Sequence, residues 1–127
     1  MHPLFLRIDN LNLLVSNLDE ALVFYCQRLG HSLIWRTDRA AGLRLPDSDA
    51  ELVLHTDNYS TETDLMVESV SKAIAEFVSA GGKLVSGPHE IAIGHCAVVE
   101  DPWCNRLVIL DCSKGKLQVD NNMNVVR

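Results

Sequence analysis

The segment HCAVVEDPWCNRLVILD, residues 95–111, decides the fold of this chain. Pro102 presets the backbone for the second position of a turn, and Asn105 is one of the few residues that tolerate a positive φ. Residues 101–105 are therefore expected to reverse the chain. The residues on either side are rich in valine, leucine and isoleucine, which predicts a β-hairpin with at least one buried face.

Composition narrows the class of protein. The chain has 127 residues, 47% of them hydrophobic, which is enough for one domain with a buried core. Its net charge of −6 and its pI of about 5.2 disfavour nucleic-acid binding, which usually needs a basic stripe. No apolar run approaches the roughly 20 residues of a membrane helix, and the apolar run at residues 1–6 is too short for a signal peptide. We expect a soluble, cytoplasmic protein with neither nucleic acid nor membrane as a partner.

The cysteines point to the same compartment. None of the four belongs to a C-x-x-C pair, and they lie in apolar or turn contexts, at Cys26, Cys96, Cys104 and Cys112. Four cysteines allow three disulfide connectivities, but this pattern favours free thiols in a reducing environment.

The first half of the chain reads as strand, helix and three strands. Residues 8–15 alternate, with Asn10 and Asn12 on a polar side and leucines on the other, which is strand periodicity. Asn17 can cap a helix whose apolar residues recur at helical spacing until Gly30 ends it. Short strands are then predicted at residues 32–36, 42–45 and 51–55.

The same order of elements recurs in the second half. A strand at residues 64–67 and a helix at 70–80 are expected, followed by strands at 83–85, 95–100 and 106–111. A shift of 52 positions superposes Val15 on Val67 and Gly30 on Gly82, which indicates an internal duplication. We predict one domain over residues 1–112, with modules at about 8–56 and 62–112. Residues 113–127 have little to bury and are expected to form a loose polar tail or an arm on another subunit.

These features together resemble the vicinal oxygen chelate superfamily, which includes glyoxalases, extradiol dioxygenases, fosfomycin-modifying enzymes and bleomycin-binding resistance proteins. The resemblance implies an α+β fold in which two tandem βαβββ modules form a curled mixed sheet. This sheet is a bowl with helices outside and the ligand site on its inner wall. It also implies a homodimer. It does not identify the reaction, because one fold hosts many chemistries. Residues 8–112 are covered, through the motifs Val15-Ser16-Asn17-Leu18-Asp19-Glu20-Ala21, Phe24-Tyr25, Leu29-Gly30, Ala80-Gly81-Gly82 and Glu100-Asp101-Pro102-Trp103-Cys104-Asn105-Arg106.

The resemblance further implies a divalent metal ion held by three or four His, Glu or Gln side chains on the module strands. The matching positions in this chain are Asn10, Val53, Glu62 and Val108. The valines have no lone pair to offer and Asn10 is a poor neutral ligand, which leaves Glu62. Because a single carboxylate does not hold a catalytic metal, no metal cofactor is predicted.

Two histidines leave alternatives open. His55 lies two residues after Val53 and therefore on the same face of its strand, where it can form a displaced metal set with Glu62 and Glu51. Its other interpretation is a strand-end histidine in water. His95 either reaches into the bowl or caps a strand.

Cys104 occupies the turn position where the family pattern has glycine. We therefore expect a positive φ there, at a cost of about 1 kcal/mol. A strained, exposed thiol can be reactive, and the alternative is a tolerated substitution in a turn.

With valines at two of the implied metal positions, the bowl is predicted to bind a small molecule without a metal. Aromatic side chains supply contact area and a few polar groups orient the ligand. Glu62 can serve as a base or as the counter-ion of a cationic ligand. Trp35 and Trp103 have a second interpretation, as residues that pack under a helix and cover a turn. The expected wall comprises Asn10, Asn12, Trp35, Tyr59, Glu62, His95, Trp103 and Val108.

Three function classes follow. The favoured one is a protein that binds a small aromatic or cationic molecule without metal catalysis. The alternative is a metal-dependent lyase or oxidoreductase of glyoxalase or dioxygenase type that uses His55 and Glu62. The third is a domain that contributes only dimerisation, with a filled bowl.

Overall fold

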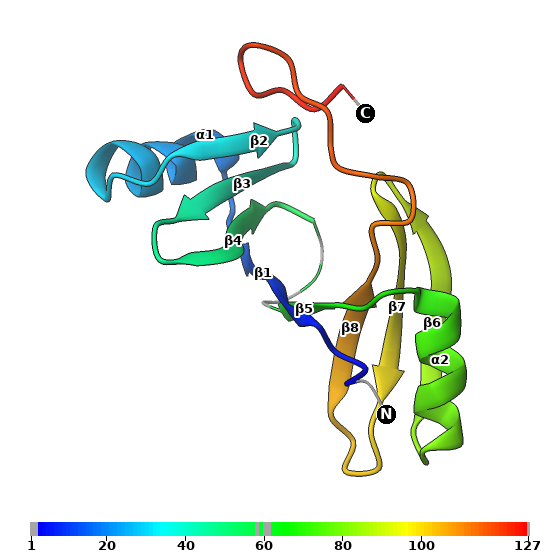
Figure 1. The fold of residues 1–127 in the computed structure, drawn as a ribbon. Coiled ribbons are helices and arrows are strands. Elements are labelled where there is room, and N and C mark those ends of the chain that lie inside the picture. The colour runs from blue at the N-terminus through cyan, green and yellow to red at the C-terminus, as the bar shows by residue number, and fades with distance from the viewer. Residues whose placement is uncertain (1–2, 58, 60–61, 127) are drawn as a thin grey trace. The chain divides into compact units, whose positions relative to one another are not determined.

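Two compact units make up the chain in a computed structural model that describes residues 3–57, 59 and 62–126. The β1–β4 unit comprises residues 9–62 and 118–127, and the β5–β8 unit comprises residues 1–8 and 63–117. Each consists of a strand, a helical segment and three further strands, and in each the first strand pairs in parallel with the last (Figure 1). The predicted α+β fold with two βαβββ modules is thereby confirmed.

In the β1–β4 unit the strands lie in the order β2-β3-β4-β1. The helix α1 continues into a π-helix, η1, and the two cover one side of these strands. The elements are β1 Arg7–Leu14, α1 Leu18–Leu22, η1 Val23–Arg28, β2 Leu33–Arg36, β3 Ala40–Leu45 and β4 Ser48–His55.

The signals that begin and end this helical segment are confirmed. The Asn17 side chain accepts a hydrogen bond from the Glu20 backbone N–H at 2.9 Å, as an N-cap residue does. Gly30 has a φ of 84°, the left-handed conformation that glycine adopts readily after a helix. Between the helical segment and the strands lies an apolar core built around Leu18, Ala41, Leu43, Leu52 and Leu54.

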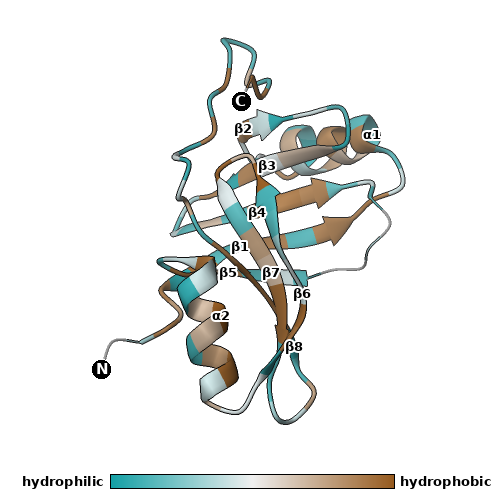
Figure 2. Cartoon of the chain, turned by 90° about the vertical axis from the view of Figure 1, so that its right-hand side faces the viewer, coloured by the Kyte–Doolittle hydropathy of each residue, from teal (hydrophilic) through white to brown (hydrophobic). Residues whose placement is uncertain are grey.

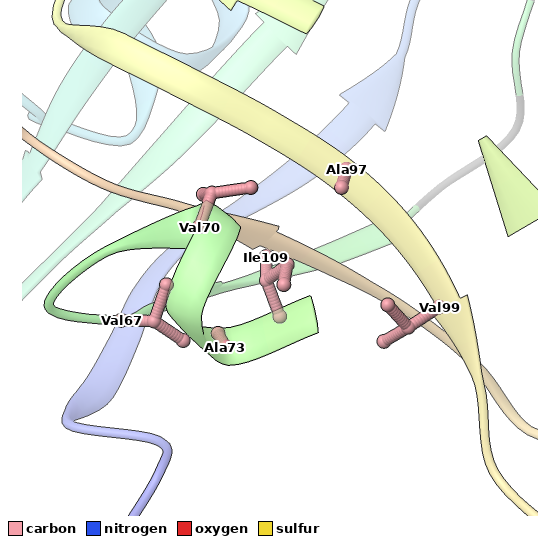
Figure 3. Close-up of a cluster of buried hydrophobic side chains, with 6 residues drawn as sticks. All are labelled: Val67, Val70, Ala73, Ala97, Val99 and Ile109. Atoms are coloured by element: carbon pink, nitrogen blue, oxygen red, sulfur yellow. The ribbon is translucent and has the colours of Figure 1, made fainter. Parts of the chain in front are cut away.

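The β5–β8 unit repeats the arrangement, with strand order β5-β8-β7-β6. Helix α2 is capped by Ser69, whose hydroxyl accepts from the Lys72 backbone N–H. Figure 2 shows apolar and polar residues alternating along α2, and Figure 3 shows the buried cluster to which α2 contributes Val70 and Ala73. The elements are β5 Glu62–Met66, α2 Val70–Ser79, β6 Lys83–Ile91, β7 Gly94–Glu100 and β8 Arg106–Leu110, and the core cluster is Val67, Val70, Ala73, Ala97, Val99 and Ile109.

Two segments differ from expectation. β6 is six residues longer than the strand predicted at 83–85, because it continues past register shifts around Ser86 and a cis bond at Gly87-Pro88. The tail is not wholly loose, because residues 123–125 pair with Arg36 at the end of β2. The Arg36 N–H donates to the Met123 carbonyl at 2.8 Å, and the Val125 N–H donates to the Arg36 carbonyl at 2.9 Å.

The hairpin at residues 101–105 forms as predicted. Asp101 accepts hydrogen bonds from the backbone N–H groups of Trp103 and Asn105, each at 2.9 Å. Cys104 has a φ of 69°, which confirms the expected positive φ. None of the four cysteines, all of which lie within the described residues, forms a disulfide. Among the described residues, no helix has the length and apolar character needed to cross a membrane.

Candidate functional site

The side of the β1–β4 unit opposite its helices carries a row of polar residues. Strand alternation places Leu13, Leu52 and Leu54 in the helix-side core, and it places the residues between them on the other side, which we call the open side. Asn10 pairs with Glu51, Asn12 with Val53 and Leu14 with His55 across β1 and β4. Three of these polar groups are buried: Asn10, Asn12 and His55.

Trp35 reaches the open side through an irregularity in β2. Leu33 pairs with Leu43 on the helix side, but the register shifts before Trp35, which pairs with Gly42. The indole lies directly over Gly42, where any Cβ would collide with it. Its Nε1–H donates to Glu51 Oε1 at 2.7 Å. Trp35 therefore does not pack under the helix, and it joins a carboxylate that the predicted wall did not include.

Burial shifts the pKa of the Glu51 carboxyl group. Loss of hydration raises the pKa of its carboxyl, and the negative charge of Asp9 adds to the effect. The Trp35 hydrogen bond and the charge of Arg44 act in the opposite direction without reversing it. The open side thus holds a carboxyl group whose charge is poorly solvated.

A chain of hydrogen bonds runs along β1 to Tyr59. Asn10 Nδ2 donates to Asp9 Oδ2 at 2.8 Å, and Asn12 Nδ2 donates to Asn10 Oδ1. Asn12 Oδ1 accepts from the Tyr59 hydroxyl at 3.4 Å. The two asparagines predicted as wall residues are therefore joined to each other and to a third predicted wall residue.

His55 is the most deeply buried polar residue of the open side. Its side chain is 1% exposed, and the Tyr59 ring stacks on the imidazole with a centroid distance of 3.8 Å and an interplanar angle of 16°. Neither ring nitrogen has a hydrogen-bond partner among the described residues. The interpretation of His55 as a strand-end histidine in water is therefore wrong, because the ring is buried.

The corresponding side of the β5–β8 unit is apolar along the middle of β7 and β8. Val108 pairs with Asp64 of β5 and with Val98 of β7. Glu62 begins β5 two residues before Asp64 and so lies on the same side of the strand as Asp64. The predicted wall did not include Asp64, although strand alternation places a residue two positions after Glu62 on the same side as Glu62. Met66 and Leu110 continue this side of the unit.

His95 and Trp103 lie apart from Val108. His95 shares its side of β7 with Ala97 and Val99, which face helix α2, so the structure does not bring it to the Val108 side. Its Nδ1 lies 3.1 Å from the Ser113 hydroxyl and 3.7 Å from Asp111 Oδ1. The side chain of Trp103 is 80% exposed at the tip of the β7–β8 hairpin.

Comparison with known proteins gives these observations a family. The model of the Glyoxalase/Bleomycin resistance protein/Dioxygenase superfamily matches residues 7–109, which is most of the chain. The chain belongs to this superfamily. No curated protein matches it in sequence.

Solved structures of low sequence identity share the superfamily fold. A chain described as NAD-dependent benzaldehyde dehydrogenase from Legionella pneumophila has a TM-score of 0.66 at 18% identity, over 82% of this chain and 98% of that one. Methylmalonyl-CoA epimerase from Mycobacterium tuberculosis gives 0.68 at 18%, over 87% and 90%. The H200Q variant of homoprotocatechuate 2,3-dioxygenase from B. fuscum gives 0.64 at 23%, over 86% of this chain but only 33% of the dioxygenase.

The residues of this superfamily member fit a metal ion poorly at the implied positions. Asn10 is engaged with Asp9 and Asn12, and Val53 and Val108 offer no ligand atom. Within the described part of the chain, no group of three or more His, Cys, Asp or Glu residues is arranged to hold a metal. The displaced set of His55, Glu62 and Glu51 does not form such a group.

Proposed function

We propose that this superfamily member is a binding protein that takes a small aromatic or cationic molecule on the open side of its β1–β4 unit, without metal catalysis. The single observation that carries the proposal is the Trp35–Glu51 pair. An indole over Gly42 offers a flat apolar surface, and a poorly solvated carboxylate beside it offers a counter-charge. Asn10 and Asn12 supply polar groups that can orient the ligand.

A cationic aromatic probe tests this function directly. Phenyltrimethylammonium is titrated into the Trp103→Phe variant, so that Trp35 is the sole tryptophan reporting by fluorescence. We expect saturable quenching and a loss of affinity of roughly tenfold in Glu51→Gln, which keeps the acceptor for Trp35 and removes the charge. Neutral tert-butylbenzene, which has the same shape, should bind both proteins alike.

Glu62 remains a proposed base or counter-ion and is tested alongside. If Glu62 contributes the counter-charge, Glu62→Gln weakens binding of the cation, and if Glu51 does, only Glu51→Gln does so. Unaltered affinity in both variants would contradict a carboxylate counter-ion. An absence of binding by the wild type would contradict the function itself.

One observation favours the alternative function, a metal-dependent glyoxalase- or dioxygenase-type enzyme. His55 has two ring nitrogens without partners among the described residues, and an imidazole nitrogen is a common metal ligand. Elemental analysis of protein purified without chelators decides between the two. A stoichiometric divalent metal that is lost in His55→Gln would support the enzyme, whereas the binding protein predicts neither.

The proposal includes a homodimer, which the superfamily resemblance implies, and a cytoplasmic location, which the cysteine pattern favours. Light scattering coupled to size-exclusion chromatography measures the mass of the particle in solution. A mass twice that of the 14.1 kDa chain is expected, and a monomer at all concentrations tested would contradict it.

A further inference from the structure

The burial of His55 is not explained by its contacts with the described residues. A neutral imidazole has one N–H donor and one acceptor nitrogen, and burying either without a partner is unfavourable because its hydration is lost without replacement. His55 is 1% exposed and has no partner for either nitrogen among these residues. A bound molecule that supplies a hydrogen-bonding group would recover part of this cost.

Tyr59 covers the imidazole without satisfying it. The two rings are stacked at 3.8 Å, and ring nitrogens form hydrogen bonds in the plane of the ring, so a stacked phenol contacts the face and leaves the nitrogens alone. The Tyr59 hydroxyl instead donates to Asn12 Oδ1 at 3.4 Å, near the upper limit for a hydrogen bond.

The Asn12 side chain has a fixed orientation. Its Nδ2 donates to Asn10 Oδ1, and Asn10 in turn donates to Asp9, which leaves the Asn12 carbonyl oxygen as the atom that meets the phenol. The β1 strand therefore presents an acceptor, and His55 presents a ring face, to whichever hydroxylated ring lies there.

Tyr59 is also the more exposed member of the stack. It is 40% exposed, whereas His55 beneath it is buried. Rotation of the Tyr59 side chain away from the stack would uncover the imidazole for a ligand. A free phenol can form the same stack and, because it is not tethered to the backbone, can also shift its hydroxyl toward a ring nitrogen of His55.

We infer that Tyr59 occupies a ligand subsite formed by His55 and Asn12, and that the ring taken up there in exchange is a phenol. This inference rests on the proposed function and narrows its ligand class to molecules with a hydroxylated aromatic ring. Tyr59 acts as an internal competitor, which lowers the apparent affinity by the fraction of molecules in which the subsite is open.

Removing the competitor tests the inference. The probe is p-cresol, which reproduces the tyrosine side chain, and toluene is the matched ring without a hydroxyl. We expect Tyr59→Ala to bind p-cresol at least about tenfold more tightly than wild type does, since the closed fraction is removed. The gain for toluene should be smaller, because toluene cannot use Asn12 or a His55 nitrogen.

Phe24→Ala is the control variant, because Phe24 is also half exposed and in contact with one neighbouring ring, that of Tyr25. It should leave p-cresol affinity unchanged. NMR signals of the His55 ring should shift on addition of p-cresol, whereas those of His31 should not. Tyr59→Phe keeps the stack and loses the Asn12 hydrogen bond, so its gain should fall between those of wild type and Tyr59→Ala. It decides the question if Tyr59→Ala does not fold.

The inference is overturned if Tyr59→Ala, or Tyr59→Phe in its place, binds p-cresol no more tightly than wild type, or gains equally for toluene. In that case Tyr59 is a fixed part of the wall. The phenyltrimethylammonium titration separates this failure from failure of the proposed function. Binding of the cation that depends on Glu51 would leave the proposed function standing while the Tyr59 exchange is rejected.

Discussion

The two units share their topology and their helix-side cores but differ on the side away from the helices. In the β1–β4 unit that side carries Asn10, Asn12, Glu51 and His55, joined to Trp35 and Tyr59 by hydrogen bonds or stacking. In the β5–β8 unit the apolar residues Met66, Val98, Val108 and Leu110 lie on that side, and the charged residues Asp64, Glu100 and Arg106 flank them. The strand order and the helix-side core therefore set the fold, and the other side is free to become either a polar site or an apolar surface.

Buried polar groups in the β5–β8 unit support the fold, and Asp111 is the clearest case. Its carboxylate accepts hydrogen bonds from the backbone N–H groups of Val70, His95 and Ser113 and from the Ser113 hydroxyl. Burial would raise its pKa, but these hydrogen bonds outweigh burial and hold the pKa below its usual range.

We expect Asp111→Ala to cause the largest loss, about 3 kcal/mol in the free energy of unfolding. The substitution leaves the backbone N–H groups of Val70, at the start of α2, and of His95, in β7, without their acceptor. Urea unfolding followed by circular dichroism measures the loss. Asp120→Ala is the control, since Asp120 accepts similar backbone hydrogen bonds from Asn122 and Asn124 in an exposed turn, and it should lose about 1 kcal/mol. Equal losses would mean that burial adds nothing at Asp111.

In the β1–β4 unit the corresponding weak point is Gly42. A Cβ there collides with the Trp35 indole, so Gly42→Ala should expel the ring, break its bond to Glu51 and cost about 2 kcal/mol. The measurement is urea unfolding, together with a red shift of Trp35 emission in the Trp103→Phe background. In a Trp35→Ala background the same substitution should cost much less. An unchanged cost there would show that the strand, and not the indole, requires glycine.

Placing an apolar residue on the polar side of one unit, and a polar residue on the apolar side of the other, tests whether the polarity of each side matters to stability. Asn12→Leu removes the hydrogen bonds to Asn10 and Tyr59 and should destabilise the chain by about 1 kcal/mol. Val108→Asn places an amide on the apolar side beside Asp64 and should cost a similar amount. Thermal unfolding of both variants measures the effects. Stabilisation by either substitution would mean that the polarity of that side is incidental to the fold.

Much of the fold was accessible from the sequence because local signals and the repeat agreed. Alternation in β1, the Asn17 cap, Gly30 and the Asp101–Asn105 turn were each confirmed by the structure. The tail was missed, although Asp120-Asn121-Asn122-Met123-Asn124 has the same spacing of Asp and Asn as the hairpin turn. Met123 adopts a φ of 66°, just as Cys104 does. Its pairing with β2 is a long-range contact that no local pattern encodes.

The candidate site was harder to predict from the sequence, because it too depends on contacts that no local pattern encodes. A register shift in β2 turns Trp35 away from the side of Leu33, and strand alternation alone cannot place a residue after such an irregularity. The link between Trp35 and Glu51 joins residues 16 positions apart, so it depends on this shift. The burial of His55 likewise depends on Tyr59, which follows it in a connection without strand periodicity.

The smallest expected effect is on the pH dependence of the free energy of unfolding, to which one carboxyl group in each unit contributes with opposite sign. The pKa of Glu51 is raised, so its stabilising contribution is greatest below about pH 4.5, its usual value, and is lost as the pH rises through the pKa of the folded state. Glu100 lies between Lys83 and Arg106, whose hydrogen bonds and charges lower its pKa. Its contribution is present at neutral pH and is lost as the pH falls through its folded-state pKa.

Glutamine at either position does not titrate, and this isolates each contribution. The free energy of unfolding of Glu51→Gln minus that of wild type should increase from pH 4.5 to pH 7, because only the wild type acquires a poorly solvated charge. For Glu100→Gln the same difference should become more negative with rising pH. Urea unfolding at several pH values measures both. If the Glu51 difference is flat or follows that of Glu100, the carboxylate on the open side is well solvated or well paired, and the counter-charge assigned to it for a cationic ligand loses its physical basis.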